Sequence, residues 1–296
     1  MKYREQNIWH IAANIVLGLV ALVAVIPIVL LFIASFTDEQ WALANGYSFF
    51  PAKLSLEAYR YILREASMIG RGYLNTIFVT IVGTACSITL TTLLAYALEK
   101  EDLPGVRVLN FLVIFTMLFS GGIVASYYIW TNIFHIRDTY WALILPGLMM
   151  NAFNVILVKN YYRSSIPKSL LEAARIDGAS IFGVFTRIVV PLSRPIIATI
   201  GLMTGLAYWN DWTNGLYYLS SRKGADYYTI QLILNKINDS IAFLQNSTSA
   251  QTSGISFPSA TARMAIAVFG ILPVLIIYPF LQKHFVKGIT IGAVKE

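Results

Sequence analysis

The chain has 296 residues, of which 57% are hydrophobic and only 12% are charged. A soluble globular chain carries roughly a quarter charged residues, so this one cannot cover a soluble surface, and its hydrophobicity also excludes intrinsic disorder. The single cysteine, Cys86, excludes a disulfide scaffold. The composition therefore indicates an integral membrane protein.

The net charge of +7 comes from 22 Lys and Arg against 15 Asp and Glu. In a membrane protein such an excess is typical of short cytoplasmic loops, which collect Lys and Arg. Placing the N-terminus in the cytoplasm puts the denser basic loops inside. This distribution predicts that both termini are cytoplasmic, and it explains the charge without a nucleic-acid partner.

A helix needs roughly 20 mostly apolar residues to cross the hydrocarbon layer. Six stretches meet this condition, and they are too long and continuous for barrel strands. We therefore expect an all-α integral membrane protein with six transmembrane helices, forming one transmembrane domain over residues 1–296. The expected spans are Ile11–Phe36, Tyr73–Leu98, Val106–Trp130, Tyr140–Tyr162, Pro195–Leu219 and Arg263–Phe285.

Two expected external loops are long, at about residues 37–72 and 220–262. Neither has enough residues for a folded domain with its own core. We interpret them as loops that contact a partner or cap the spans, with plain connectors as the alternative.

The long internal loop, at about residues 163–194, has a pattern of its own. Pro167 suits a helix start and Gly178 a helix stop, while Ser180 suits the cap of a second helix that Pro191 ends. The loop is thus predicted to form two short helices joined at Gly178. From these features alone it could dock a partner, lie on the lipid surface, bind DNA as a helix-turn-helix, or serve as a linker.

Small and charged residues in this loop favour the docking interpretation. Ala173 and Ala174 allow another backbone to approach closely, and Glu172 offers one charge to a basic partner. The spacing resembles the loop of ABC importer permeases, which reads E-A-A, three residues, G, nine residues, I, one residue, L-P. Here Gly178, Ile188 and Pro191 occupy the matching positions, and only Val190 departs, in place of Leu.

Residues 49–51, 55–59 and 75–76 resemble the maltose-type carbohydrate permeases. Residues 116–122, 209–212 and 287–295 resemble a branch of that family that serves oligosaccharides and polysaccharide-derived sugars. The resemblance implies a bacterial cytoplasmic membrane protein that pairs with a second homologous permease, two ABC ATPase subunits and an extracytoplasmic sugar-binding protein. The helix around Glu172 would insert into an ATPase cleft, and Lys287, Gly288 and Gly292 in the tail would reach the ATPase interface.

No catalytic or cofactor site is predicted in this chain. It has no G-x-x-x-x-G-K-[ST] motif, so the resemblance leaves ATP and magnesium to the ATPase partners. The signature-like Ser120-Gly121-Gly122 lies inside an apolar span, where it favours helix packing or a kink. The histidines are far apart, so no metal site is expected. The alternatives are a self-sufficient secondary transporter or channel and an intramembrane enzyme.

Polar and aromatic side chains inside the expected spans are candidates for a sugar path. Sugars bind to aromatic faces and to amides or carboxylates, and polar groups within a membrane must be paired or face water. For the amides the alternative is helix–helix hydrogen bonding, for the aromatics an interfacial belt, and for Asp211 pairing with an arginine or with the backbone. The candidates are Asn151 and Asn154 in the fourth span, and Tyr208, Trp209, Asp211 and Trp212 in the fifth.

Overall fold

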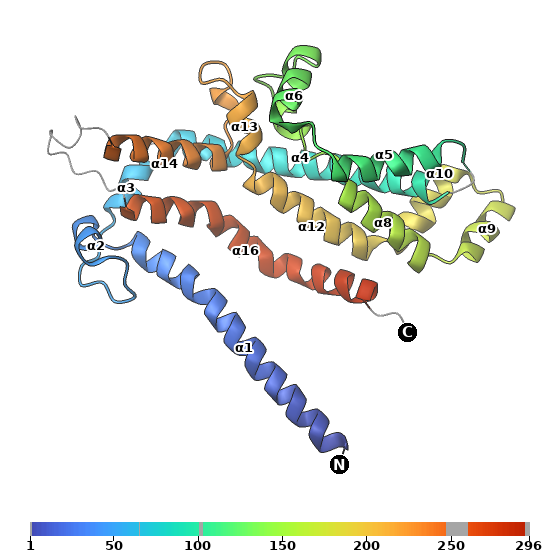
Figure 1. Ribbon diagram of the computed structural model, residues 1–296, viewed down its shortest axis with the longest axis horizontal. Coiled ribbons are helices and arrows are strands. Elements are labelled where there is room, and N and C mark those ends of the chain that lie inside the picture. Colours follow the sequence, from blue (N-terminus) through green and yellow to red (C-terminus); the bar gives the residue numbers. More distant parts are fainter. Residues whose placement is uncertain (1, 65, 101–102, 247–259, 294–296) are drawn as a thin grey trace. The chain divides into compact units, whose positions relative to one another are not determined.

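The computed structural model describes residues 2–64, 66–100, 103–246 and 260–293. Within these ranges, side chains are described for all residues except 2–8, 243–246, 278 and 280–293. The described residues are mainly helical and contain no named strand, only an isolated antiparallel bridge between Thr37 and Leu54 (Figure 1). The helices are α1 (Lys2–Ser35), α2 (Glu39–Asn45), α3 (Glu57–Leu63), α4 (Ala66–Glu99), α5 (Val106–Leu118), α6 (Gly122–Tyr128), η1 (Ile129–Ile133), α7 (Trp141–Ile144), α8 (Ala152–Ser165), α9 (Lys168–Ile176), α10 (Ile181–Val184), η2 (Phe185–Val189), α11 (Val190–Leu192), α12 (Arg194–Asn210), α13 (Thr213–Tyr218), η3 (Ala225–Tyr227), α14 (Ile230–Asn246) and α16 (Ala260–Ala293).

The chain divides into two compact units. The first contains residues 1–69 and 234–274, and the second contains residues 70–233 and 275–296. Three long helices, α4, α14 and α16, pass from one unit to the other along the chain.

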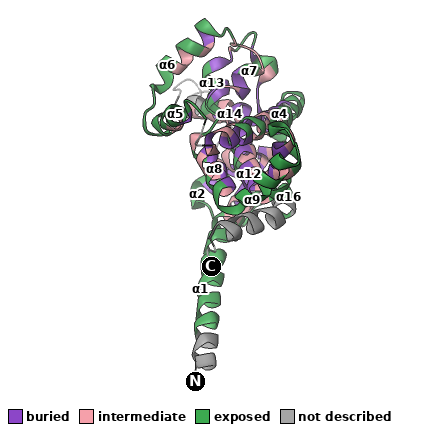
Figure 2. Cartoon of the chain, turned by 90° about the vertical axis from the view of Figure 1, so that its right-hand side faces the viewer, coloured by how far each residue is buried: buried purple, intermediate pink, exposed green. Residues whose placement is uncertain are grey.

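In the first unit, α1 is an apolar helix that is exposed over most of its described length. Residues 9–27 are exposed throughout, as Figure 2 shows for the described part of this helix. Such a surface is incompatible with water and requires lipid or a partner. The end of α1 is packed, because the Ser35 hydroxyl and the Tyr59 hydroxyl share a hydrogen bond of 2.7 Å and the rings of Phe36 and Tyr59 stack with centroids 4.8 Å apart.

A buried carboxylate joins the segment after α1 to the start of α16, also within the first unit. Glu39 is only 5% exposed, and its carboxylate accepts hydrogen bonds from the backbone N–H groups of Ala260 (2.8 Å) and Thr261 (2.9 Å). The Thr261 hydroxyl donates a third, at 2.6 Å. Because the first N–H groups of a helix have no partner within it, Glu39 acts as a cap supplied from a distant part of the chain.

In the second unit, α4 and α12 approach closely because small residues line their contact. A Cβ atom at Gly83 would lie 2.5 Å from the ring of Tyr208, and one at Gly205 would lie 3.6 Å from the Thr84 hydroxyl. Gly201 and Gly205 are four residues apart on α12, and this small-residue spacing lets membrane helices pack backbone to backbone.

Among the described residues, three helices are long and apolar enough to cross a membrane, within residues 9–35, 66–99 and 260–277. A fourth crossing is obtained if residues 181–192 and 194–210 are taken as one span, which bends by 79° at Ser193. Three predicted spans are therefore found as long helices, but six are not confirmed among the described residues.

The third and fourth expected spans are interrupted at turns. Residues 119–121 separate α5 from α6, and Gly122, the first residue of α6, has a φ of +76°, in agreement with the predicted kink at Ser120-Gly121-Gly122. Gly147, with a φ of +71°, lies between α7 and α8. The third and fourth spans are thus each divided into shorter helices, because these backbone angles cannot continue a right-handed helix.

The expected external loops also contain helices. Residues 37–72 include α2, α3 and the first turns of α4, and residues 220–262 include η3, α14 and the start of α16. The helix α14 forms because its apolar side chains are periodic and buried: Ile230, Leu232, Ile233, Leu234 and Ile241 are each less than 5% exposed.

Candidate functional site

The 163–194 loop has the two-helix form that its sequence predicts. The helix α9 ends in a Schellman motif, in which the Ala179 N–H donates to the Ala174 carbonyl (2.9 Å) and the Gly178 N–H donates to the Arg175 carbonyl (3.0 Å). Gly178 has a φ of +82°, in the left-handed region that a side chain resists. The Ser180 hydroxyl then accepts a hydrogen bond from the Gly183 N–H at 3.1 Å and caps α10.

The prediction that Pro191 ends the second helix is wrong, because the chain stays helical to Leu192 through η2 and α11. The Val190 N–H at the end of η2 donates to the Phe185 carbonyl, five residues back, so the helix is locally widened before the proline. Proline lacks an N–H and its ring collides with the carbonyl four residues earlier, and a π-helical turn relieves both problems.

One face of the loop packs into the second unit. Leu171, Ala174 and Ile188 are partly buried against a core that contains Tyr96 of α4 and Tyr162 of α8. The rings of Tyr96 and Phe185 have centroids 5.1 Å apart, and those of Tyr96 and Tyr162 lie edge to face at 6.5 Å. A displacement of the loop would therefore be transmitted to α4 and α8.

Other residues of the loop are exposed, and they include large apolar side chains and the acid Glu172. Ile176 is 86% exposed, Phe182 is 67% exposed and Ile181 is 63% exposed, while Glu172 and Ala173 are also exposed. Large apolar side chains exposed beside a charge are typical of a surface that a protein partner covers.

A hollow of about 370 Å³ lies beside the turn that follows α9, and its lining includes Gly178 and Ser180 of the turn and Arg187 and Ile188 of η2. Of the residues predicted for this loop, the structure thus brings Gly178 and Ile188 to the hollow and leaves Glu172, Ala173 and Pro191 exposed, whereas Ala174 packs inward.

Basic side chains gather where α9 approaches the end of α4. Burial lowers the pKa of the Lys100 ammonium, the nearby Arg175 guanidinium lowers it further, and the Glu99 carboxylate raises it. The Lys100 ammonium lies 4.2 Å from the centre of the Tyr96 ring, an aromatic contact that favours the cation.

The candidate sugar-path residues separate into two groups. Asn154, Tyr208 and Trp209 are buried, at 6%, 1% and 7% exposure. The Asn154 amide donates to the Thr204 hydroxyl at 3.3 Å, and the Tyr208 hydroxyl donates to the Ile144 carbonyl at 2.8 Å. These two side chains therefore link helices to one another. For Asn154 this agrees with the alternative that its amide forms helix–helix hydrogen bonds.

The other candidates lie at breaks in the helices. Asn151 caps α8, since its Oδ1 accepts from the Phe153 N–H (2.9 Å) and the Asn154 N–H (3.3 Å). Asp211 does the same for α13, accepting from the N–H groups of Thr213 (3.1 Å) and Asn214 (3.3 Å). Asn151 is exposed, Trp212 is 40% exposed and Asp211 is intermediate, so these three remain accessible to a solute.

The predicted tail residues Lys287, Gly288 and Gly292 belong to α16, but their side chains lie outside the described part of the chain. Among the described residues, no group of three or more His, Cys, Asp or Glu side chains could hold a metal ion.

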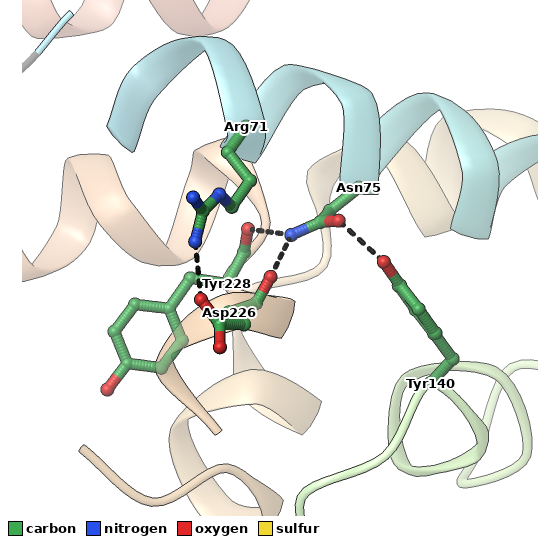
Figure 3. Close-up of polar contacts among 5 residues, drawn as sticks. All are labelled: Arg71, Asn75, Tyr140, Asp226 and Tyr228. Carbon is green, nitrogen blue, oxygen red and sulfur yellow. Dashed lines mark hydrogen bonds and ion pairs between the residues drawn. The ribbon is translucent and has the colours of Figure 1, made fainter. Parts of the chain in front are cut away.

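At the other end of the second unit, a polar cluster was not predicted from the sequence. The Asn75 amide of α4 donates to the backbone carbonyls of Asp226 (2.8 Å) and Tyr228 (3.0 Å), and its Oδ1 accepts from the Tyr140 hydroxyl at 2.8 Å (Figure 3). Arg71 forms an ion pair with Asp226. A buried asparagine in an apolar helix is the signal that could have located it.

Comparison with known proteins identifies the family. The model for the inner membrane component of binding-protein-dependent transport systems matches residues 103–291, and the chain belongs to this family. It is a multi-pass membrane protein and a component of a larger transport system. The predicted resemblance to the permease subunits of ABC importers is confirmed.

Individual relatives cover nearly the whole chain. The polygalacturonan/rhamnogalacturonan transport system permease protein YtcP of Bacillus subtilis strain 168 is 42% identical over 93% of this chain and 94% of that protein. The arabinooligosaccharides transport system permease protein AraQ of Halalkalibacterium halodurans is 28% identical over the full length of both. A solved bacterial ABC transporter involved in the import of the acidic polysaccharide alginate contains a chain with a TM-score of 0.76 and 32% identity, covering 95% of this chain and 98% of that one.

Proposed function

We propose that this chain is a permease subunit of an ATP-driven importer of oligosaccharides in the bacterial cytoplasmic membrane, with both termini in the cytoplasm. It forms the translocation path with a second homologous permease. Two ATPase subunits bind ATP and magnesium, and an extracytoplasmic binding protein delivers the sugar. This chain has no cofactor of its own in the proposal.

The exposed face of α9 and α10 is the single observation that carries the coupling part of the proposal. The exposed carboxylate of Glu172 lies on α9 with Ile176, and Ile181 and Phe182 of α10 are exposed as well, so the loop offers apolar side chains and an acid to a cleft on an ATPase. The other face of the loop packs on α4 and α8 through Tyr96 and Phe185. Closure of the ATPases on ATP would move this loop as a rigid body and bias the path between its inward-open and outward-open states. Lys287, Gly288 and Gly292 are proposed to contact the same ATPase interface.

The substrate class is proposed from the relatives. YtcP is named for polygalacturonan and rhamnogalacturonan and the solved transporter for alginate, and the second of these is described as acidic. We therefore favour acidic oligosaccharides over neutral ones. The proposed sugar contacts are the residues that lie at helix breaks and stay accessible, namely Asn151, Asp211 and Trp212. The other candidates are buried, and we propose that they line the path by packing beneath these contacts: Asn154, Tyr208 and Trp209.

Charge reversal at Glu172 tests the coupling. Glu172→Lys should abolish ATP-driven uptake by the reconstituted complex. The variant should still insert into the membrane and unfold at the wild-type temperature, because residue 172 is exposed and supports no described contact. Asp239→Lys, an equal change at an exposed position of α14, is the matched control and should transport normally. Uptake by Glu172→Lys at the rate of the control would contradict the proposal.

A further inference from the structure

The helix α8 of the second unit carries a lysine near its middle, among apolar residues. Val155 and Val158 of this helix are 1% and 0% exposed, and Lys159 beside them is half-buried. Charged side chains within membrane spans are rare because their desolvation is costly, and they usually mark a functional site or a solute path. The charge of Lys159 therefore calls for a partner and for a function.

Asn110 of α5 supplies the partner. The Lys159 ammonium donates a hydrogen bond to the Asn110 Oδ1 at 2.6 Å. The Asn110 amide nitrogen in turn donates to the Val106 carbonyl at 3.1 Å and to the Leu98 carbonyl near the end of α4 at 3.5 Å. These two carbonyls fix the amide, so that its oxygen is directed at Lys159. The contact joins α4, α5 and α8 and holds the ammonium in one place.

This partner does not neutralise the lysine. Asn110 is uncharged, and among the residues that the structure describes no carboxylate forms an ion pair with Lys159. An ammonium group has three N–H donors, of which Asn110 accepts one. The others can donate to an anion that reaches the half-buried side chain.

The place of Lys159 in the fold suits a solute that travels along α8. Lys159 precedes the end of α8 at Ser165 by about 9 Å, at a rise of 1.5 Å per residue, and the 163–194 loop follows that end. The proposed sugar contact Asn151 caps the other end of the same helix, about 12 Å from Lys159 by the same rise. If the 163–194 loop is cytoplasmic, a sugar that leaves Asn151 passes Lys159 on its way inward.

We propose that Lys159, positioned by Asn110, binds a carboxylate of an acidic oligosaccharide at the inner end of the path, an inference that rests on the proposed function. Charge complementarity supports this ligand. The relative YtcP is named for polygalacturonan and rhamnogalacturonan, and the solved transporter is described as importing an acidic polysaccharide. A hydrogen bond between two charged groups is stronger than one between neutral groups, so this contact would favour acidic over neutral sugars.

An anionic lipid headgroup is the competing ligand. A lysine that serves headgroups extends its ammonium to the membrane surface. The Lys159 ammonium is instead bonded to a partly buried amide between α5 and α8. The sugar is therefore favoured as the ligand.

The test measures equilibrium binding to the transporter of two permeases and ATPases in nanodiscs of phosphatidylcholine, a lipid without net charge. The soluble binding protein is left out so that its own affinity does not mask the site. The probes are a radiolabelled galacturonate trisaccharide and its methyl ester, which is the same sugar without the charges. Lys159→Gln should weaken binding of the acid about tenfold or more and leave the ester unchanged, because hydrogen bonds to charged groups contribute about 1.5–3 kcal/mol.

Two controls separate this loss from a general effect of charge. Lys159→Arg keeps the cation and should keep the preference for the acid. Lys223→Gln removes an equal charge at an exposed position and should keep it as well. Unchanged binding of the acid by Lys159→Gln would overturn the proposal, and so would an equal loss of acid and ester, which indicates a structural role.

Asn110→Asp tests the lack of a counterion. The new carboxylate can still accept from Lys159 but cancels its charge, so the ratio of acid to ester affinity should fall as in Lys159→Gln. This ratio does not depend on the amount of folded protein, and an unchanged ratio would overturn the proposal. If Lys159→Gln instead binds both sugars normally but loses stabilisation by added phosphatidylglycerol, the site belongs to lipid and the proposal is wrong. Wild-type transporter that binds acid and ester equally would refute the acidic substrate class itself, before any variant is compared.

Discussion

The ring of Tyr208 on α12 occupies the space that a side chain at Gly83 on α4 would need. A Cβ atom at position 83 would lie 2.5, 2.7 and 2.8 Å from three carbon atoms of that ring, which is 1% exposed and held by a hydrogen bond to the Ile144 carbonyl. Three segments of the second unit therefore meet at one pair of residues.

Gly83→Ala should destabilise the protein by about 1–3 kcal/mol, because an overpacked contact forces side chains or backbone to shift. The measurement is thermal unfolding of the detergent-solubilised protein. Gly205→Ala is the matched control on the same helix pair, since its new methyl group would make an ordinary contact at 3.6 Å with Thr84. Equal unfolding temperatures for the two variants would show that the Tyr208 ring yields freely.

Asn75→Leu should release residues 225–230 from α4. The change leaves the Tyr140 hydroxyl and the carbonyls of Asp226 and Tyr228 without their partner, at a cost of about 1–3 kcal/mol for each group that stays buried. Hydrogen exchange of the backbone amides in this segment should accelerate. Asn45→Leu, at an exposed asparagine whose amide donates only to the Trp41 carbonyl, should leave that exchange unchanged. Slow exchange in both variants would contradict the conclusion that Asn75 holds residues 225–230 against α4.

Glu39→Gln should loosen the start of α16, because a neutral amide with one oxygen cannot replace a carboxylate that accepts three hydrogen bonds. Hydrogen bonds to a charged group contribute about 1.5–3 kcal/mol, so unfolding at lower temperature is expected.

The same variant should shift the titration of Tyr47. Burial raises the pKa of the Tyr47 phenol, the Glu39 charge raises it further, and Arg263 lowers it. Removing the negative charge at residue 39 should therefore lower the pKa of Tyr47, so that the phenol ionises at less alkaline pH. The ultraviolet difference titration against Tyr47→Phe measures this change. A rise, or no change, would show that the Glu39 charge does not act on Tyr47.

Gly178→Val should impair assembly with the ATPase, because a β-branched residue resists the φ of +82° that the end of α9 requires. The expected result is loss of ATPase from the affinity-purified complex at unchanged membrane level of the permease. Gly70→Val adds the same side chain at an exposed helical position with open space and ordinary φ, and it should keep the ATPase. Retention of the ATPase by Gly178→Val would refute the need for the turn.

Local rules account for the features that sequence analysis predicted well. The end of α9 at Gly178 and the cap at Ser180 each depend on a few adjacent residues, and the long apolar runs of α1, α4 and α16 satisfy a length condition. Such features need no knowledge of what lies beside them.

The features that were missed depend on distant contacts or on backbone angles. Composition does not distinguish a continuous span from one that breaks at Gly147, since the flanking residues are equally apolar. The hydrogen bonds of Asn75 and Asp138 became visible only when the fold placed residues 218–228 beside them. Tyr208 was selected as a possible sugar contact because it is polar and aromatic, and Gly83 explains why it is buried instead.

The central claim is that this chain transports only when an ATPase drives it through the 163–194 loop. The direct measurement is uptake of a radiolabelled acidic oligosaccharide into liposomes that contain either this chain alone or the complete set of two permeases, ATPases and binding protein, with ATP supplied on the ATPase side. We expect uptake by the complete set only, and its loss with Glu172→Lys. Uptake by this chain alone would contradict the account and indicate a self-sufficient transporter or channel.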